Sequence, residues 1–149
     1  MLIGKVKLSE IISGGEASRK LMAMPNIDIK TAFWLAKIAK KCDDFIKPYN
    51  ETINLKVKEI QNEMILKDEK GELKLSENKQ NFIFADGYDY EKYSNKINES
   101  AEKLQEEEVD FENIEKIKLS KFENIKIEPM YLGQLLWLIE YDIDSEPAK

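Results

Sequence analysis

The sequence predicts an α+β fold in which a long kinked helix, a third helix and a buried C-terminal helix pack with a small antiparallel sheet. Apolar residues follow a helical spacing from Ala32 to Met64, residues 129–141 are apolar nearly all round, and short stretches alternate as strands do. The chain has 149 residues, a length that suits one domain. We therefore expect a single α+β domain over residues 1–142 and a disordered tail over residues 143–149.

The first two predicted elements are a strand and a helix. Residues 2–8 alternate apolar and basic side chains, as expected of a half-buried strand. Residues 9–24 have an apolar side at helical spacing, but Gly14 and Gly15 lie within this segment. Because glycine weakens a helix interior, we expect a short helix that is broken at these two residues.

The long helix is predicted to begin after Asp28, whose side chain suits an N-cap. Pro48 lies inside the apolar pattern, where it removes one backbone donor and crowds the preceding turn. The pattern continues in phase beyond Pro48, so we expect one kinked helix or two nearly collinear ones. The apolar seam behind this prediction consists of Ala32, Leu35, Ala39, Cys42, Ile46, Tyr49, Ile53, Val57, Ile60 and Met64.

The stretch IKTAFWLAKIAKK, residues 29–41, combines lysines with aromatic residues, a composition also found in membrane-binding and nucleic-acid-binding helices. Trp34 flanks the seam, and the lysines fall off it: Lys30, Lys37, Lys40 and Lys41. An interfacial membrane helix needs a bulky apolar face, whereas the seam here carries small residues suited to close helix packing. We interpret the stretch as a core helix with solvated lysines, and membrane and nucleic-acid binding are the alternatives.

Three further elements are predicted downstream of the long helix. A hairpin is expected to pair residues 65–67 with residues 72–75 across the charged turn at Gly71. Residues 82–84 are expected to form a strand or an anchored loop. The third helix is predicted to run from Asp89, a suitable N-cap, to about residue 107.

The C-terminal part is predicted to contain short extended segments between residues 109 and 127, followed by a last helix. Pro129 suits the first position of that helix, which we expect to run to about Tyr141. Because this helix has little polar face, it should be buried in the core or covered by a partner. One form of that prediction is a homodimer formed through the C-terminal helix and Trp137.

Composition excludes several kinds of chemistry. The chain has no histidine and one cysteine, Cys42. This removes histidine-dependent triads, histidine metal sites, multi-thiolate zinc sites and internal disulfides. Ser76 with Lys79, and Ser100 with Lys103, have the S-x-x-K spacing but lack its partner motifs. We therefore expect no enzyme activity, no cofactor and no metal site.

One glycine-bearing segment has two interpretations. SGGEASRK, residues 13–20, could form a phosphate-cradling loop that opens a helix, with Gly14, Gly15 and Arg19 binding the anion. It lacks the spacing of the P-loop and dinucleotide motifs. The alternative is a flexible loop that binds nothing.

An acidic segment offers a different candidate surface. Acidic residues dominate residues 86–115, with Glu106, Glu107 and Glu108 as the densest run and with Tyr90 and Tyr93 nearby. An acidic helix bearing tyrosines could occupy a basic groove on another protein through charge complementarity and aromatic anchors. The alternative is an exposed helix in an acidic protein. The net charge of −6 opposes general binding to polyanions, so nucleic acid is not the expected partner.

The order of the segments resembles that of small, uncharacterised bacteriophage and prophage proteins of Gram-positive bacteria. The resemblance lies in the block KLMAMPNIDIKTAFWLAKIAKKCDDFIKPYNETINLKVKEI with its long helix, the charged turn KDEKGELKL and the block IKLSKFENIKIEPMYLGQLLWLI. It covers most of the chain, and its motifs are patterns of helix-facing apolar residues. It implies a phage context and supplies no catalytic residues.

We therefore expect a non-enzymatic small phage-type protein that acts through protein–protein interaction with a host or phage protein. The first alternative is an anti-defence inhibitor that presents its acidic helix to a basic nucleic-acid or ligand groove of a host protein. The second is a phosphate or nucleotide binder that uses Gly14 and Gly15. No segment has the length of a signal peptide or a membrane span, so the expected location is the cytoplasm of the host cell.

Overall fold

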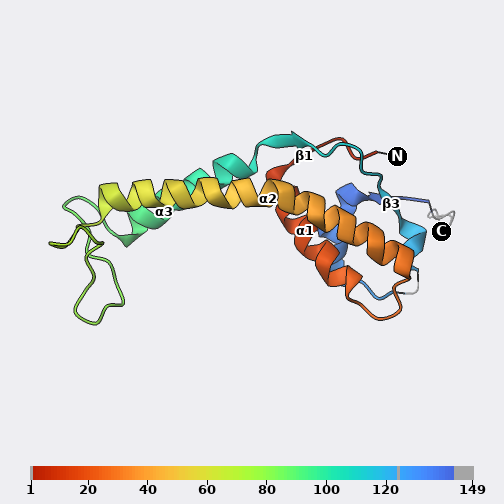
Figure 1. Ribbon diagram of the computed structural model, residues 1–149, viewed down its shortest axis with the longest axis horizontal. Coiled ribbons are helices and arrows are strands. Elements are labelled where there is room, and N and C mark those ends of the chain that lie inside the picture. Colours follow the sequence, from red (N-terminus) through yellow and green to blue (C-terminus); the bar gives the residue numbers. More distant parts are fainter. Residues whose placement is uncertain (1, 124, 143–149) are drawn as a thin grey trace. The chain divides into compact units, whose positions relative to one another are not determined.

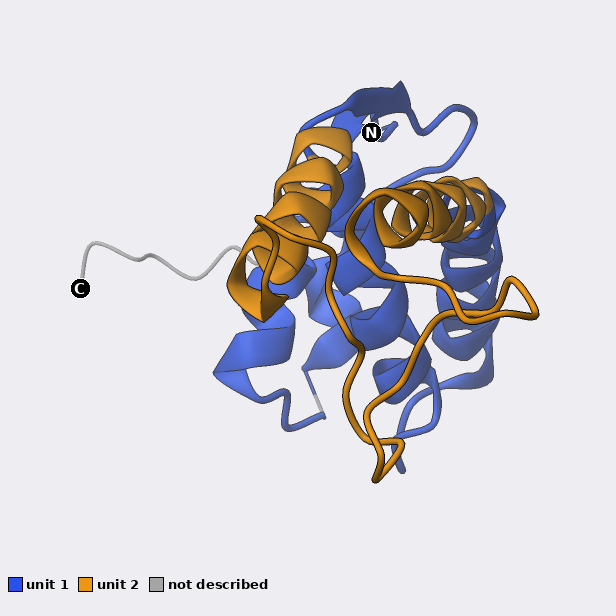
Figure 2. Ribbon diagram, turned by 90° about the vertical axis from the view of Figure 1, so that its left-hand side faces the viewer, with its two compact units in different colours: residues 1–47, 106–149 blue, residues 48–105 orange. Residues whose placement is uncertain are grey.

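The computed structural model describes residues 2–123 and 125–142 and has an α+β fold (Figure 1). The chain divides into two compact units, coloured separately in Figure 2. Unit 1 comprises Met1–Lys47 and Glu106–Lys149, and unit 2 comprises Pro48–Gln105. The expected tail, residues 143–149, lies outside the described residues.

Unit 1 begins with strand β1 (Lys5–Lys7), which leads directly into helix α1 (Leu8–Met22). The strand is shorter than predicted, although Leu2 forms an isolated antiparallel bridge with Glu115. Helix α1 continues through Gly14 and Gly15, so the predicted break does not exist. Both glycines are buried, which shows that tertiary packing compensates here for the low helix propensity of glycine.

Helix α2 (Ile29–Met64) is the longest element and runs through both units. Its predicted N-cap is confirmed, because the backbone amide of Thr31 donates to Asp28 Oδ1 at 2.9 Å and the Thr31 hydroxyl donates to Asp28 Oδ2 at 2.7 Å. These two hydrogen bonds favour the charged carboxylate and lower the pKa of Asp28. Pro48 lies inside the helix, which is continuous there, so the alternative of two separate helices is wrong.

The predicted seam of α2 is confirmed residue by residue. Leu35, Ala39, Cys42, Ile60 and Met64 are buried, and the other members are partly buried. In unit 1 the seam packs into a core shared with α1 and the C-terminal segments. Large members of that core are Ile11, Leu21, Leu35, Ile38, Phe111, Leu135 and Leu138.

Two short sheets complete unit 1. Strand β2 (Glu108–Asp110) pairs with β1 in antiparallel fashion, with Val6 opposite Val109. Strand β3 (Ile117–Lys118) pairs in parallel with strand β4 (Ile139–Glu140). Between β3 and the C-terminal elements lies the 3₁₀-helix η1 (Leu119–Phe122).

The C-terminal helix is shorter than predicted and is not buried. Helix α4 (Pro129–Gln134) begins with a proline in its first turn, as expected, but ends far before Tyr141, and none of its residues is buried. A 3₁₀-helix, η2 (Leu136–Leu138), and strand β4 follow it. The buried side chains of this region are Leu135 and Leu138, whereas Leu136 is 66% exposed.

Unit 2 contains the second part of α2, helix α3 (Tyr90–Gln105) and the segment between them. The predicted N-cap of α3 is confirmed, because the amide of Lys92 donates to Asp89 Oδ1 at 2.8 Å. Ile60, Met64, Ile65 and Tyr93 form a buried cluster that joins the two helices.

Three extended segments in unit 2 close a ring of main-chain hydrogen bonds. The amide of Leu66 donates to the carbonyl of Ile83, that of Ile83 to Lys74, and that of Lys74 to Leu66, at 2.8–3.0 Å. The predicted pairing of residues 65–67 with residues 72–75 is thus confirmed by the bridge between Lys67 and Leu73. Residues 82–84, predicted as a strand or a loop, are held by isolated bridges to both partners.

Within the described ranges, no helix is both long enough and apolar enough to cross a membrane.

Candidate interaction surface

The first part of α2 carries large apolar side chains on its exposed side. Ile29 is 85% exposed, Phe33 59% and Trp34 40%. Thr31, Leu35, Ile38 and Cys42 occupy the opposite, buried side of the same turns. At about 100° per residue, Phe33 points away from Leu35 and Cys42. Trp34 lies at the border between the exposed and the buried side, four residues before Ile38.

Lysines share this exposed side. Lys30, Lys37 and Lys40 are exposed and Lys41 is partly exposed. No ion pair joins any of them to another residue in the described ranges. We call the surface formed by Ile29, Lys30, Phe33, Trp34, Lys37, Lys40 and Lys41 the basic–aromatic face.

Lys37 links the charged and aromatic parts of this face. Its ammonium nitrogen lies 4.5 Å from the centroid of the Trp34 ring and 5.9 Å from that of Phe33. The two rings contact each other edge to face, with centroids 6.0 Å apart. These contacts hold a positive charge over the aromatic pair, so that a partner would meet both at one place.

Acidic residues lie at both ends of the basic–aromatic face along the helix. Asp28 caps the N-terminus of α2, and Asp43 and Asp44 follow Lys41 and Cys42. Asp43 forms an ion pair with Arg19 of α1. The run from Ile29 to Lys41 contains no acidic residue, and at 1.5 Å per residue it is about 18 Å long.

The residues predicted for an acidic partner surface do not form one acidic helix. Helix α3 ends at Gln105, before the run of Glu106, Glu107 and Glu108, and Glu108 begins strand β2. Within α3 the acidic residues Glu91, Glu99 and Glu102 are balanced by Lys92, Lys96 and Lys103. Lys7 Nζ donates a hydrogen bond to Glu106 Oε2 at 2.9 Å and forms an ion pair with it. The prediction of a rigid acidic helix is therefore wrong.

The two predicted tyrosines differ in accessibility. Tyr90 is 69% exposed, whereas Tyr93 is 8% exposed and accepts a hydrogen bond from Gln61 Nε2 at 3.1 Å. The Tyr93 ring also packs against Phe82 and Phe84. A partner that approaches α3 can therefore reach Tyr90, while Tyr93 stabilises unit 2.

Trp137 is partly buried in unit 1 and lies in η2, beyond the end of α4. Its ring packs edge to face on Phe111 with centroids 5.2 Å apart. A Cβ atom placed on Gly14 would lie only 2.6 Å from Trp137 Cζ2, so the indole lies directly against α1. The helix predicted to form a dimer thus ends before Trp137, whose side chain is occupied within its own unit.

Gly14 and Gly15 have a packing role in place of the predicted loop. Both lie in the middle of α1, where backbone amides are used in helical hydrogen bonds and cannot cradle a phosphate. A Cβ atom on Gly15 would lie 3.0 Å from Cys42 Cβ, so Gly15 allows α1 to approach α2 closely. Arg19 is engaged by Asp43. The phosphate loop predicted from this segment is therefore absent.

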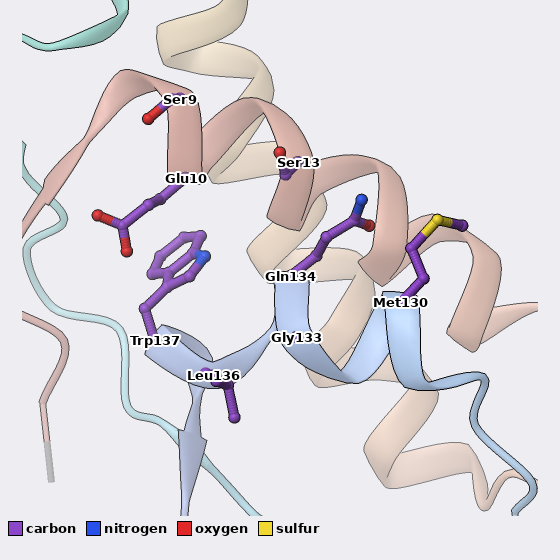
Figure 3. A pocket seen from close by; sticks show the side chains of 8 residues that line it. All are labelled: Ser9, Glu10, Ser13, Met130, Gly133, Gln134, Leu136 and Trp137. Carbon is purple, nitrogen blue, oxygen red and sulfur yellow. The ribbon is translucent and has the colours of Figure 1, made fainter.

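A pocket of about 450 Å³ lies between α1 and the C-terminal elements (Figure 3). Figure 3 shows the indole of Trp137 between Glu10 of α1 and Gln134 of α4. Gln134 Oε1 and Trp137 Nε1 have no hydrogen-bond partner in the described ranges, but both atoms are closed off from solvent. The pocket is lined by Ser9, Glu10, Ser13, Met130, Gly133, Gln134, Leu136 and Trp137.

The remaining candidate nucleophiles are either buried or hydrogen-bonded. Burial raises the pKa of the Cys42 thiol to about 12, although the nearby Arg19 guanidinium opposes the shift. The Ser100 hydroxyl donates to the carbonyl of Lys96 at 3.0 Å, and the Ser76 hydroxyl donates to Asn78 Oδ1. Within the described ranges no group of three or more His, Cys, Asp or Glu side chains could hold a metal ion.

Sequence reasoning missed the exposed apolar part of the basic–aromatic face. The prediction of solvated lysines agrees with the structure, but the sequence interpretation placed Trp34 as a flank of the seam and gave Phe33 no exposed position. The signal was present, because Ile29 and Phe33 are four residues apart on the side of α2 opposite the seam.

We compared the chain with known proteins by sequence and by structure. No family model, no curated protein and no solved structure matches the chain.

Proposed function

We propose that this chain is a non-enzymatic protein that acts by binding another protein through the basic–aromatic face of α2. The observation that carries the proposal is the exposure of Ile29, Phe33 and Trp34 on one helix side. Exposed aromatic side chains such as these are enriched among the anchors that dominate protein interfaces. The exposed apolar area of these side chains does not stabilise the fold. Its burial by a partner would stabilise a complex.

The cellular setting belongs to the same proposal. The resemblance to small bacteriophage and prophage proteins suggests a phage or host protein as the partner and the host cytoplasm as the place of action. The anti-defence role is a narrower form of this proposal. In that form the inhibitor would use the basic–aromatic face, since α3 carries balanced charges.

The experiment is affinity capture from a lysate of the bacterial host with the wild-type chain and two variants. Phe33→Ser/Trp34→Ser removes the aromatic anchors, and Leu55→Ser is the control, because Leu55 is 68% exposed on the same helix in unit 2. We expect the first variant to capture at least about tenfold less of the partner protein than the wild type, because removal of a hot-spot pair has an effect of this size. The control should capture as much as the wild type.

Both variants replace exposed side chains, so their melting temperatures should stay close to that of the wild type. Equal capture by the wild type and the Phe33→Ser/Trp34→Ser variant would contradict the proposal.

A further inference from the structure

We infer that the partner of the basic–aromatic face is an acidic peptide segment with apolar side chains, presented by another protein. This inference rests on the proposed function and adds the chemistry of the partner. The lysines of the face have no ion-pair partners in the described ranges, so their charges are available for carboxylates. Apolar side chains of the same segment would pack on Phe33 and Trp34, which are exposed.

Lys37 shows how one segment can satisfy both requirements. Its ammonium group lies over the rings of Trp34 and Phe33, at 4.5 and 5.9 Å from their centroids. A carboxylate that binds this ammonium group therefore brings its neighbours in the peptide onto the rings. Desolvation of the rings by those neighbours would strengthen the ionic contact.

The boundaries of the face favour a short acidic segment over a nucleic acid. Asp28 precedes the basic run, and Asp44 follows it on the exposed side of α2. A phosphate backbone that continues in either direction would meet these carboxylates, whereas a segment that ends within about 18 Å would not. The net charge of −6 adds to this repulsion of a long polyanion.

The arrangement of side chains also differs from that of a membrane-surface helix. Such a helix separates a continuous apolar side from a polar side. Here Lys37 lies between Phe33 and Trp34 around the helix circumference, so the cations interrupt the apolar surface. The opposite, continuously apolar side is the buried seam and cannot reach a bilayer.

The test uses defined probes with the full chain. The first probe is a fluorescein-labelled peptide of Glu and Leu, about 12 residues long, with leucines at helical spacing, so that as a helix it spans about 18 Å. The second is the same peptide with Gln in place of Glu. A labelled oligothymidylate and vesicles that contain phosphatidylserine represent the nucleic-acid and membrane alternatives.

By fluorescence anisotropy, we expect the Glu peptide to bind at least about tenfold more tightly than the Gln peptide at low salt. Its affinity should fall several-fold at about 0.5 M salt, where surface charges are screened. The double variant Lys37→Glu/Lys40→Glu should bind it at least about tenfold more weakly. The matched control Lys58→Glu/Lys96→Glu, which changes the net charge equally at exposed positions of unit 2, should bind like the wild type.

Three results would overturn the inference: equal binding of the Glu and Gln peptides, tighter binding of the oligothymidylate or the vesicles, or full binding by the Lys37→Glu/Lys40→Glu variant. Lysate capture separates these failures from failure of the proposed function. If capture depends on Phe33 and Trp34 but is unchanged in the Lys37→Glu/Lys40→Glu variant, the proposed protein contact is supported and the inference of an acidic partner is wrong.

Discussion

Gly14 lies where helix α1 meets the indole of Trp137. The indole carbons lie so close that a methyl group at this position would have to displace a large ring that also packs on Phe111. Gly15 allows a similar approach to Cys42. At these two residues, the absence of a side chain allows unit 1 to pack tightly.

The first prediction concerns this contact. Gly14→Ala should lower the free energy of unfolding by about 1–2 kcal/mol, because the cost of overpacking exceeds the gain in helix propensity. Gly133→Ala is the control: it places a methyl group in open space in α4 and should leave stability unchanged or slightly higher. Urea denaturation measures both. Equal stability of the two variants would show that Trp137 does not lie against Gly14.

The second prediction concerns the thiol of Cys42, which is fully buried. Burial disfavours the thiolate and raises the pKa to about 12, so the thiol should be almost fully protonated at neutral and mildly alkaline pH. In the native protein, reaction with a thiol reagent at about pH 8 should be at least about a hundredfold slower than in denaturant. Rapid native reaction would contradict the buried position of the seam.

At the scale of elements, the sequence was informative where a pattern is local. The seam of α2 and the caps at Asp28 and Asp89 follow from spacing and side-chain chemistry, and the structure has them. The end of α4 depends on an interaction between residues that are distant in the sequence, because residues 139–140 pair with β3. Pairing with that strand competes with continuation of the helix, and the apolar composition of the segment carries no information about it.

The same distinction explains the candidate sites. The break expected at Gly14 and Gly15 rests on local propensity, which contacts with Trp137 and Cys42 override. The predicted third helix extends into the acidic run because no capping signal in the sequence marks the helix end at Gln105. The exposed Phe33 and Trp34 could have been found from the sequence by asking which residues lie opposite the seam.

The third prediction concerns Pro48 within α2. The helix continues through this exposed residue, which lacks the amide needed for the helical hydrogen bond. Pro48→Ala should therefore raise the free energy of unfolding by about 1–3 kcal/mol. Lys47→Ala, at an exposed neighbouring position, serves as the control and should change it little. A lower melting temperature for Pro48→Ala would show that the proline ring has a structural role.

At the scale of the whole molecule, helix α2 belongs to both compact units. Unfolding of either unit would leave part of this helix without its apolar partners, and isolated helices of that length are marginal in water. If the chain is one domain, both units should therefore unfold together. Calorimetry should show one transition with equal calorimetric and van 't Hoff enthalpies. Two separated transitions would show that the units are independent domains.

The central claim is that the basic–aromatic face of α2 is the contact surface, and hydroxyl-radical footprinting tests it most directly. Phe33 and Trp34 are exposed in the free protein and should be oxidised there. With the Glu–Leu peptide bound, we expect both to be protected, while oxidation of Trp137 and Tyr90 stays unchanged. Unchanged oxidation of Phe33 and Trp34, with protection at Tyr90 or at residues 106–108, would contradict the account.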